Sequence, residues 1–164
     1  MKIQTKLIKA VHTKQNPYSA ITTPIFLAST YAQDEINKPG EFEYQRGKNP
    51  TTKAFEDSIC AVFGASYAHA TASGMGAITL ALNLLKTGQK VLFCENIYGG
   101  TFRYAKQIME NIGIKYELRS DLESLKSLSA DVGAIYIETP SNPLLNITDI
   151  KKIVALAHAN NAIV

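Results

Sequence analysis

The chain has 164 residues, and its 17 lysine and arginine residues exceed its 14 aspartate and glutamate residues by three. A formal charge of +3 without a dense basic run argues against a nucleic-acid-binding protein. No apolar stretch reaches the roughly 18 residues that a membrane span needs, and the N-terminus lacks the apolar centre of a signal peptide, so we expect a cytoplasmic protein with no membrane partner.

The first 49 residues show no sustained hydrophobic period, and four of the six prolines lie within the first fifty residues. We interpret residues 1–49 as an extended N-terminal arm that builds no core of its own. Apolar side chains such as Ile25 and Leu27 would be exposed on such an arm, so we expect a partner subunit to cover them.

Regular structure is predicted from residue 50 onwards. Phe55, Ile59, Val62 and Phe63 follow a helical spacing and predict an amphipathic helix that stops at Gly64. The later elements are predicted as helix 74–86, strand 90–94, helix 101–113, strand 114–118, short helix 121–129, strand 132–138 and a helix that begins at Thr148 or Asp149. Strands that alternate with helices indicate a right-handed, parallel α/β sheet.

The last three residues, "AIV" (162–164), read as the opening of another buried strand. A central strand of three residues would leave apolar faces of the sheet uncovered. We therefore expect residues 50–164 to be the N-terminal portion of a larger α/β domain, and the chain to be the N-terminal part of a longer protein.

A turn of small residues, "TASGMGA" (71–77), precedes the predicted helix 74–86. Backbone amides and the helix dipole converge at such a turn and can hold an anion. The turn matches neither the Walker pattern nor the dinucleotide pattern GxGxxG, whose last position is Thr79 here. On its own it is equally compatible with tight packing of a strand against a helix.

Three other loops carry side chains suited to chemistry. "YQRGKNPT" places Tyr44 and Arg46 before a helix, and arginine offers a planar fork that matches phosphate. "ENIYGGTFRY" and "ETPSNPL" follow two predicted strands and bring Tyr98, Glu138 and Asn142 to the carboxyl edge of the sheet, where ligands bind in open α/β folds. Taken singly, each loop has a purely structural alternative. The first would ordinarily be a solvated basic loop, the second a glycine-rich turn around a core tyrosine, and the third a proline-fixed turn.

Metal and serine-hydrolase chemistry find no support in the sequence. His12, His69 and His158 are far apart and lack ligand spacing, so no metal site is expected. Ser73 has no GxSxG elbow around it. The two cysteines are isolated, and we expect both to be buried as small apolar residues in a reducing compartment.

In their order along the chain, "YQRGKNPT", "ASGMGAI", "YGGTFRY" and "ETPSNP" resemble the Cys/Met-metabolism enzymes that use pyridoxal 5'-phosphate (PLP). That family includes cystathionine γ-synthase, cystathionine γ- and β-lyases, methionine γ-lyase and O-acetylhomoserine sulfhydrylase, and "TTPIFLASTYA" is similar to the segment before its first motif. The resemblance implies the PLP-dependent transferase fold, aspartate aminotransferase-like fold type I, with residues 50–164 as the incomplete large domain.

The resemblance also implies a set of cofactor contacts. Ser73, Gly74 and Met75 would hold the phosphate of PLP, chiefly through the backbone amides of Gly74 and Met75. Tyr98 would stack on the pyridine ring and assist proton transfer, and Asn142 would lie beside the ring hydroxyl.

Further implied roles concern the partner subunit and the substrate. Tyr44 and Arg46 would reach the phosphate of a neighbouring subunit's cofactor in a dimer or a dimer of dimers, that is, a homotetramer. Arg103 would lie near the distal end of the substrate, and Glu138 would shape the substrate pocket. Gly100 stands where methionine γ-lyases usually carry cysteine, which argues against that branch.

The resemblance places the family's Schiff-base lysine, and the aspartate that pairs with the pyridine nitrogen, after residue 164. We therefore expect the 164-residue chain alone to be inactive and the full-length parent to be active. The implied substrates are small amino acids such as cystathionine, O-acyl-homoserine or cysteine, in methionine and cysteine metabolism. Synthase, γ-lyase, β-lyase and sulfhydrylase chemistry stay open at this point, as does a non-catalytic domain that only binds or assembles.

Overall fold

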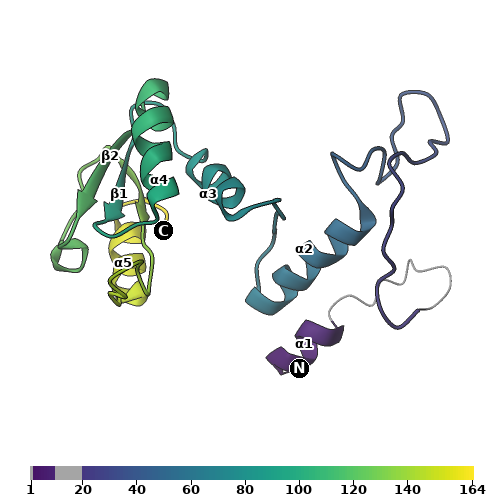
Figure 1. The fold of residues 1–164 in the computed structure, drawn as a ribbon, viewed down its shortest axis with the longest axis horizontal. Coiled ribbons are helices and arrows are strands. Elements are labelled where there is room, and N and C mark those ends of the chain that lie inside the picture. Colours follow the sequence, from purple (N-terminus) through teal and green to yellow (C-terminus); the bar gives the residue numbers. More distant parts are fainter. Residues whose placement is uncertain (1, 10–19) are drawn as a thin grey trace. The chain divides into compact units, whose positions relative to one another are not determined.

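The structure, a computed structural model, describes residues 2–9 and 20–164. It divides into two compact units, Met1–Ala72 and Ser73–Val164 (Figure 1). Within the described ranges, no helix combines the length and apolar character needed to cross a membrane. His12 lies outside the described residues.

The described residues of the first unit form the helices α1 (Ile3–Lys9) and α2 (Pro50–Phe63). The predicted helix that stops at Gly64 is confirmed as α2, whereas α1 lies in a segment for which the sequence predicted no helix. Helix α2 begins after Asn49, whose side-chain oxygen accepts a hydrogen bond from the Thr51 amide at 2.8 Å. It ends because Gly64 adopts a left-handed conformation, with φ of 67°, which glycine tolerates without a steric penalty.

Residues of the predicted arm are tied to the start of α2 by Asn49, which is buried. Its side-chain nitrogen donates to the Phe26 carbonyl oxygen at 3.1 Å and to the Tyr31 hydroxyl at 3.2 Å. Ile25 and Leu27 are 77% and 85% exposed, as expected for an arm that lacks its own core. Their cover by a partner subunit stays a prediction. Two members of the apolar stripe on α2, Phe55 and Phe63, are exposed.

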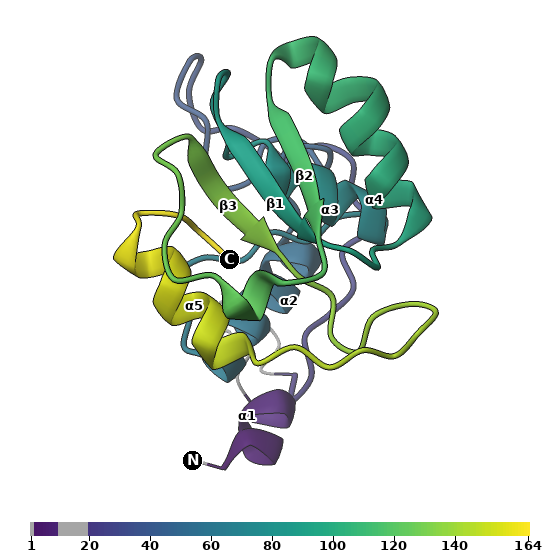
Figure 2. The ribbon, with the colours of Figure 1, turned by 90° about the vertical axis from the view of Figure 1, so that its left-hand side faces the viewer.

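The second unit is built on a parallel sheet of three strands, β1 (Lys90–Cys94), β2 (Lys115–Arg119) and β3 (Val132–Tyr136). Their order is β2-β1-β3, so the first strand of the sheet lies at its centre (Figure 2). The parallel α/β sheet predicted from the sequence is confirmed.

Helices cover both faces of this sheet (Figure 2). Helices α3 (Gly74–Leu82) and α4 (Gly99–Tyr104) lie on one face, and α5 (Ile150–Ala159) lies on the other. Successive residues of a strand point to opposite faces, so β1 supplies both cores. The α3/α4 core consists of Leu82, Leu85, Val91, Phe93, Ala105, Met109, Ile114 and Ala134. The α5 core consists of Leu92, Leu122, Val132, Ile135, Ile153, Ala157 and Ala162.

Three predicted helices have different bounds in the structure. Helix α3 ends at Leu82 rather than residue 86, because the Leu84 and Leu85 amides donate three residues back instead of four. Helix 101–113 starts at Gly99 and continues through a π-helical stretch, Ala105–Met109, and a 3-10 turn. Segment 121–129 forms only the 3-10 turn Leu122–Ser124, because its polar side chains bond locally and compete with a helix.

Residues 162–164 were expected to open a strand, and Ile163 forms a parallel bridge with Ala134 of β3. The Ile163 amide donates to the Gly133 carbonyl oxygen at 3.0 Å, and the Ile135 amide donates to the Ile163 carbonyl oxygen at 2.8 Å. The expected strand is thus present as this single bridge, and Ile163 is 44% exposed rather than buried.

Candidate functional site

The sheet has a topological switch point between β1 and β3. The chain leaves β1 towards α4, on one face, and leaves β3 towards α5, on the other face. The two loops diverge at the carboxyl ends of the strands, which is the place where open α/β sheets bind ligands. Tyr98 lies on the first loop, and Glu138 and Asn142 lie on the second.

The first turn of α3 offers backbone amides to a ligand. The Ser73 hydroxyl oxygen accepts from the Gly76 amide at 3.1 Å, and the first intrahelical bond runs from the Ala77 amide to the Ser73 carbonyl oxygen. The Gly74 and Met75 amides precede that bond and so have no acceptor within the helix. A Cβ placed on Gly74 would meet nothing within 4 Å, so the turn is open to an incoming group.

The Tyr98 ring lies beside this turn. A Cβ placed on Gly100 would be 2.4 Å from Cε1 of Tyr98 and 2.9 Å from the sulfur of Met75. Both neighbours therefore lie against the backbone of Gly100, and the missing side chain makes room for them. Tyr98 is 48% exposed, so part of its ring is accessible to a ligand.

Glu138 joins the two loops across the switch point. Its Oε1 atom accepts from the Tyr98 backbone amide at 2.9 Å and from the Tyr136 hydroxyl at 3.4 Å. The Glu138 amide in turn donates to the sulfur of Cys94 at 3.3 Å. Burial is the main cause of a raised pKa at both the Cys94 thiol and the Tyr136 hydroxyl, and the Glu138 charge raises both further. Cys94 is half-buried, as is Cys60 in α2, so the prediction that both cysteines are buried is wrong.

Arg103 lies on α4, after the first loop, and Asn142 lies within the second loop. Arg103 is exposed on α4, and its Nη1 atom would be 3.5 Å from a Cβ placed on Gly99, so the side chain folds back towards the first turn of that helix. Asn142 is exposed on a loop that is folded around buried Ser141, whose hydroxyl oxygen accepts from the Asn146 amide.

Tyr44 and Arg46 belong to the first unit, where they form a pair of their own. The Arg46 guanidinium carbon lies 5.1 Å from the centre of the Tyr44 ring, a cation–π arrangement. The Tyr44 carbonyl oxygen accepts from the amides of Gly47 and Lys48, and the Gln45 amide donates to Ser29. The loop that carries the pair is thus held by its backbone, while both side chains remain at the surface.

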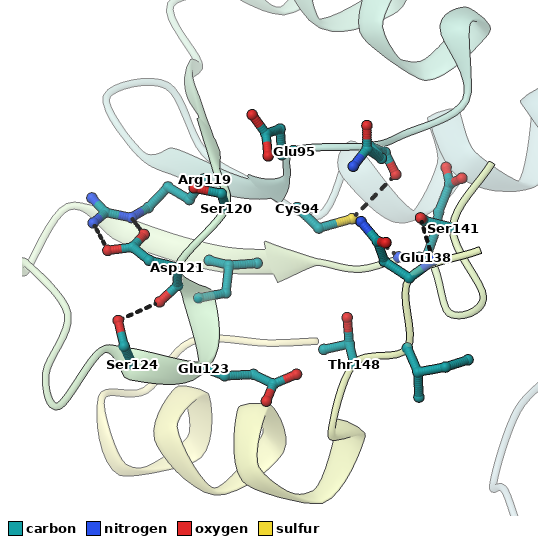
Figure 3. A pocket seen from close by; sticks show the side chains of 14 residues that line it. Cys94, Glu95, Arg119, Ser120, Asp121, Glu123, Ser124, Glu138, Ser141 and Thr148 are labelled. Atoms are coloured by element: carbon teal, nitrogen blue, oxygen red, sulfur yellow. Dashed lines mark hydrogen bonds and ion pairs between the residues drawn. The ribbon is translucent and has the colours of Figure 1, made fainter. Parts of the chain in front are cut away.

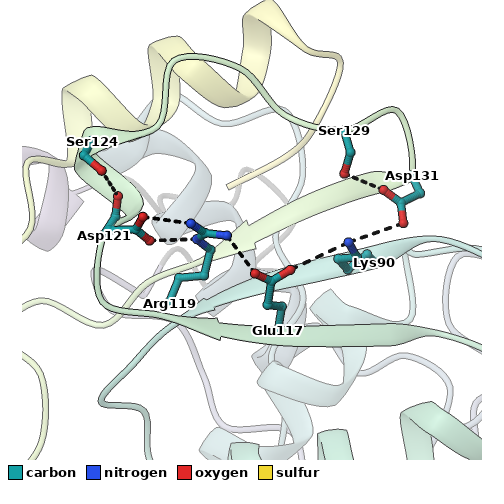
Figure 4. Close-up of polar contacts among 7 residues, drawn as sticks. All are labelled: Lys90, Glu117, Arg119, Asp121, Ser124, Ser129 and Asp131. Atoms are coloured by element: carbon teal, nitrogen blue, oxygen red, sulfur yellow. Dashed lines mark hydrogen bonds and ion pairs between the residues drawn. The ribbon is translucent and has the colours of Figure 1, made fainter.

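A cavity of about 490 Å³ lies at the carboxyl ends of the three strands (Figure 3). Its acidic lining residues are Glu95, Asp121, Glu123 and Glu138. Arg119 also lines it, but its guanidinium already binds Asp121 through two bonds, of 2.7 and 2.8 Å, and Glu117 at 2.7 Å (Figure 4). An acidic cavity whose arginine is already paired does not suit a phosphate, which favours the first turn of α3 as the anion site.

The structure thus gathers most of the predicted site residues in one unit. The α3 turn, with Ser73, Gly74 and Met75, lies beside Tyr98, and Tyr98 is bonded to Glu138. The sequence reasoning missed the contact of Cys94 with the Glu138 amide. Cys94 and Glu138 each end a predicted strand, but no local pattern predicted that these two strands are neighbours. In the described ranges, no group of three or more potential metal ligands comes together.

Comparison with known proteins places these features in a family. Residues 4–164 match the family described as "Cys/Met metabolism PLP-dependent enzyme". The cystathionine beta-lyase of Lactococcus lactis subsp. cremoris is 38% identical over 164 residues, which are 98% of this chain and 43% of that protein. The cystathionine gamma-lyase of Dictyostelium discoideum is also 38% identical, with the same two coverages.

Solved structures agree with the sequence relatives. The cystathionine gamma-lyase from Lactobacillus plantarum, complexed with L-serine, superimposes with a TM-score of 0.88 at 34% identity. The structure of metB from Corynebacterium glutamicum gives 0.88 at 31% identity. In both cases 99% of this chain is matched to 43% of the other chain, so this chain spans less than half the length of the proteins that it resembles.

Proposed function

Since the chain belongs to the family of Cys/Met-metabolism PLP-dependent enzymes, we propose that the complete protein is a PLP-dependent lyase that breaks a C–S bond in a cystathionine-type amino acid. The family match over residues 4–164 carries this proposal, and relatives named cystathionine beta-lyase and gamma-lyase support the lyase assignment. The proposal concerns the protein expressed from its complete reading frame.

The residues of the second unit fit the cofactor. We assign the PLP phosphate to the Gly74 and Met75 amides with Ser73, because this turn precedes the first intrahelical bond and is open. Tyr98 supplies an accessible aromatic face beside it, and Asn142 lies on the loop across the switch point. When bound, PLP supplies an electron sink for a carbanion at the substrate's α-carbon.

Two side chains have roles towards the substrate in this proposal. The Tyr98 hydroxyl accepts or returns a proton at the reacting carbons, because its ring lies at the edge of the cofactor site. Arg103, one turn along α4, binds the distal carboxylate of the substrate through its planar fork. The position of Arg103 against Gly99 supports this, since it keeps the guanidinium near Tyr98.

The first unit acts on a second subunit in this proposal. Arg46, stacked on Tyr44, binds the phosphate of the partner's cofactor, and residues 1–49 serve as the arm that reaches it. The exposed apolar residues of the arm support this assembly, since a partner would remove them from water. We place the protein in the cytoplasm, as a dimer or dimer of dimers, in methionine and cysteine metabolism.

The test is an assay of the complete protein with PLP and cystathionine. Cofactor binding is followed by absorbance, and the released oxo acid separates the two lyase reactions. Pyruvate identifies cleavage at the β-carbon, and 2-oxobutyrate identifies cleavage at the γ-carbon. A protein that binds no PLP and releases neither acid contradicts the proposal and favours a non-catalytic domain. The 164-residue chain alone is expected to release neither acid.

A further inference from the structure

Resting on the function proposed above, we propose that Glu138 is a positioning residue, whose carboxylate holds the Tyr98 backbone so that the tyrosine ring keeps its place beside the α3 turn. In this role Glu138 shapes the pocket through a contact within the protein, the bond to the Tyr98 amide.

The first observation is the start of α4. Tyr98 occupies the N-cap position of this helix and makes no side-chain capping bond, since its phenol cannot fold back as serine or aspartate can. The Tyr98 amide donates to Oε1 of Glu138, forty positions further along the chain, at 2.9 Å. The carboxylate from the β3 loop therefore does what a glutamate at the third helical position does in a capping box, a position that Thr101 occupies in α4.

The second observation is that Glu138 is itself held in place. Its backbone amide donates to Cys94 at the end of β1, and its carboxylate accepts from Tyr136 at the end of β3. Glu138 is half-buried between these strand ends. Its carboxylate thus links the β3 loop to the β1 loop at the switch point.

The third observation concerns the other end of Tyr98. Its ring lies against Gly100 and near the Met75 sulfur, so it is confined on the side of the α3 turn. Glu138 fixes the backbone of Tyr98, while Gly100 and Met75 limit where the ring can go. Loss of the carboxylate should release the loop without removing any atom of the ring.

Two substitutions separate positioning from a charge that contacts substrate. Glu138→Gln keeps an acceptor oxygen at the same reach but loses the charge. Glu138→Asp keeps the charge but is one methylene shorter, so its oxygen falls short of the Tyr98 amide. If Glu138 positions Tyr98, the glutamine variant should keep the Tyr98 backbone in place and the aspartate variant should not. If the charge of Glu138 is what matters, the aspartate variant should behave like the wild type and the glutamine variant should not. Glu95→Ala is the matched control, because Glu95 lines the same cavity on the Tyr98 loop and is exposed.

The first readout is hydrogen exchange of the peptide 95–102 in the cofactor-free complete protein. Glu138→Ala and Glu138→Asp should speed exchange at the Tyr98 amide about tenfold or more, the order expected when a bond to a charged acceptor is lost. The exchange rate in Glu138→Gln should be closer to that of the wild type than to that of the alanine or aspartate variant. The rate in Glu95→Ala should equal that of the wild type. If Glu138→Ala does not fold, the comparison of glutamine with aspartate decides.

The second readout is the visible circular dichroism and the kcat of the PLP-loaded enzyme. In both, Glu138→Gln and Glu95→Ala should resemble the wild type, and Glu138→Asp and Glu138→Ala should be impaired. Unchanged exchange in Glu138→Asp, or a glutamine variant as impaired as the aspartate variant in both readouts, overturns the proposal. If wild-type protein binds no PLP, the proposed function fails, and the exchange experiment still decides whether Glu138 holds Tyr98.

Discussion

Replacing Gly100 by alanine should push the Tyr98 ring away from the first turn of α3. The added Cβ would lie 2.4 Å from Cε1 of Tyr98 and 2.9 Å from the sulfur of Met75, whereas ordinary contacts begin at 3.4 Å. Both neighbours must therefore move, and the tyrosine has the larger distance to recover. Because Tyr98 is 48% exposed, its ring can swing towards solvent.

The cost to stability should be small. Overfilling a packed site costs about 1–3 kcal/mol, and the open space on the solvent side of the Tyr98 ring brings this cost towards the lower limit. Alanine also gains about 1 kcal/mol over glycine within a helix. We therefore expect the free energy of unfolding to change by less than about 1 kcal/mol.

The effect of Gly100→Ala on the affinity for PLP should be easier to measure than its effect on stability. Stacking on an aromatic ring contributes about 0.5–1.5 kcal/mol beyond burial. Its loss corresponds to a dissociation constant for PLP that rises about two- to tenfold. Equilibrium dialysis of the complete protein measures this constant, and thermal unfolding measures stability.

Gly99→Ala is the matched control. The added Cβ would lie 3.5 Å from the Arg103 guanidinium, an ordinary contact, on the same helix turn. Its affinity for PLP should equal that of the wild type. If Gly100→Ala and Gly99→Ala bind PLP equally well, the assigned place of the Tyr98 ring is wrong.

The site and its surroundings support four further predictions. Tyr98→Phe should keep PLP but lower kcat, and Tyr98→Ala should also weaken PLP binding; unchanged kinetics in both would remove Tyr98 from the reaction. Arg46→Ala should weaken PLP retention and Arg46→Lys should restore it only in part, because lysine lacks the fork. Refolded mixtures of Arg46→Ala with Tyr98→Ala should recover about a quarter of wild-type activity if the subunits pair as two-fold dimers, and mixed dimers without activity would place Arg46 in its own chain's site. The Arg119 guanidinium lowers the pKa of Asp121 below its ordinary 3.8, so the pair stabilises the fold above that pH and the contribution is lost as pH falls through the lowered pKa. Asp121→Asn should therefore lower the urea midpoint at neutral pH but not in strong acid, and an equal loss at both pH values would contradict the ion pair.

The sequence was a good guide wherever one periodicity dominated. Strand β1 is a run of five residues with a fully apolar centre, and such a run in an alternating α/β pattern has few alternatives to a central parallel strand. Helix α2 was equally legible, because Pro50 and Gly64 mark its two ends with distinct backbone preferences.

Long-range polar contacts were not legible in the same way. The bond from the Tyr98 amide to Glu138 depends on the order of strands and on loop shape, neither of which has a local signature. The prediction of a helix over residues 121–129 was wrong for a related reason, because Asp121 bonds to Arg119 on the preceding strand. The roles assigned to Arg46, Asn142 and Arg103 rest on resemblance and stay predictions.

The central place of β1 also bears on how the sheet assembles during synthesis. Val91 pairs with Tyr116 on one side and with Ala134 on the other. Strand β1 is therefore synthesised first but can pair only after β2 and β3 have been synthesised. Leu92 is buried later still, because Ile153 and Ala157 of α5 cover its face of the sheet. Loop closure over such separations slows folding. A nascent chain therefore exposes an unpaired apolar strand until much of the second unit has left the ribosome, which is the interval in which a chaperone would bind it.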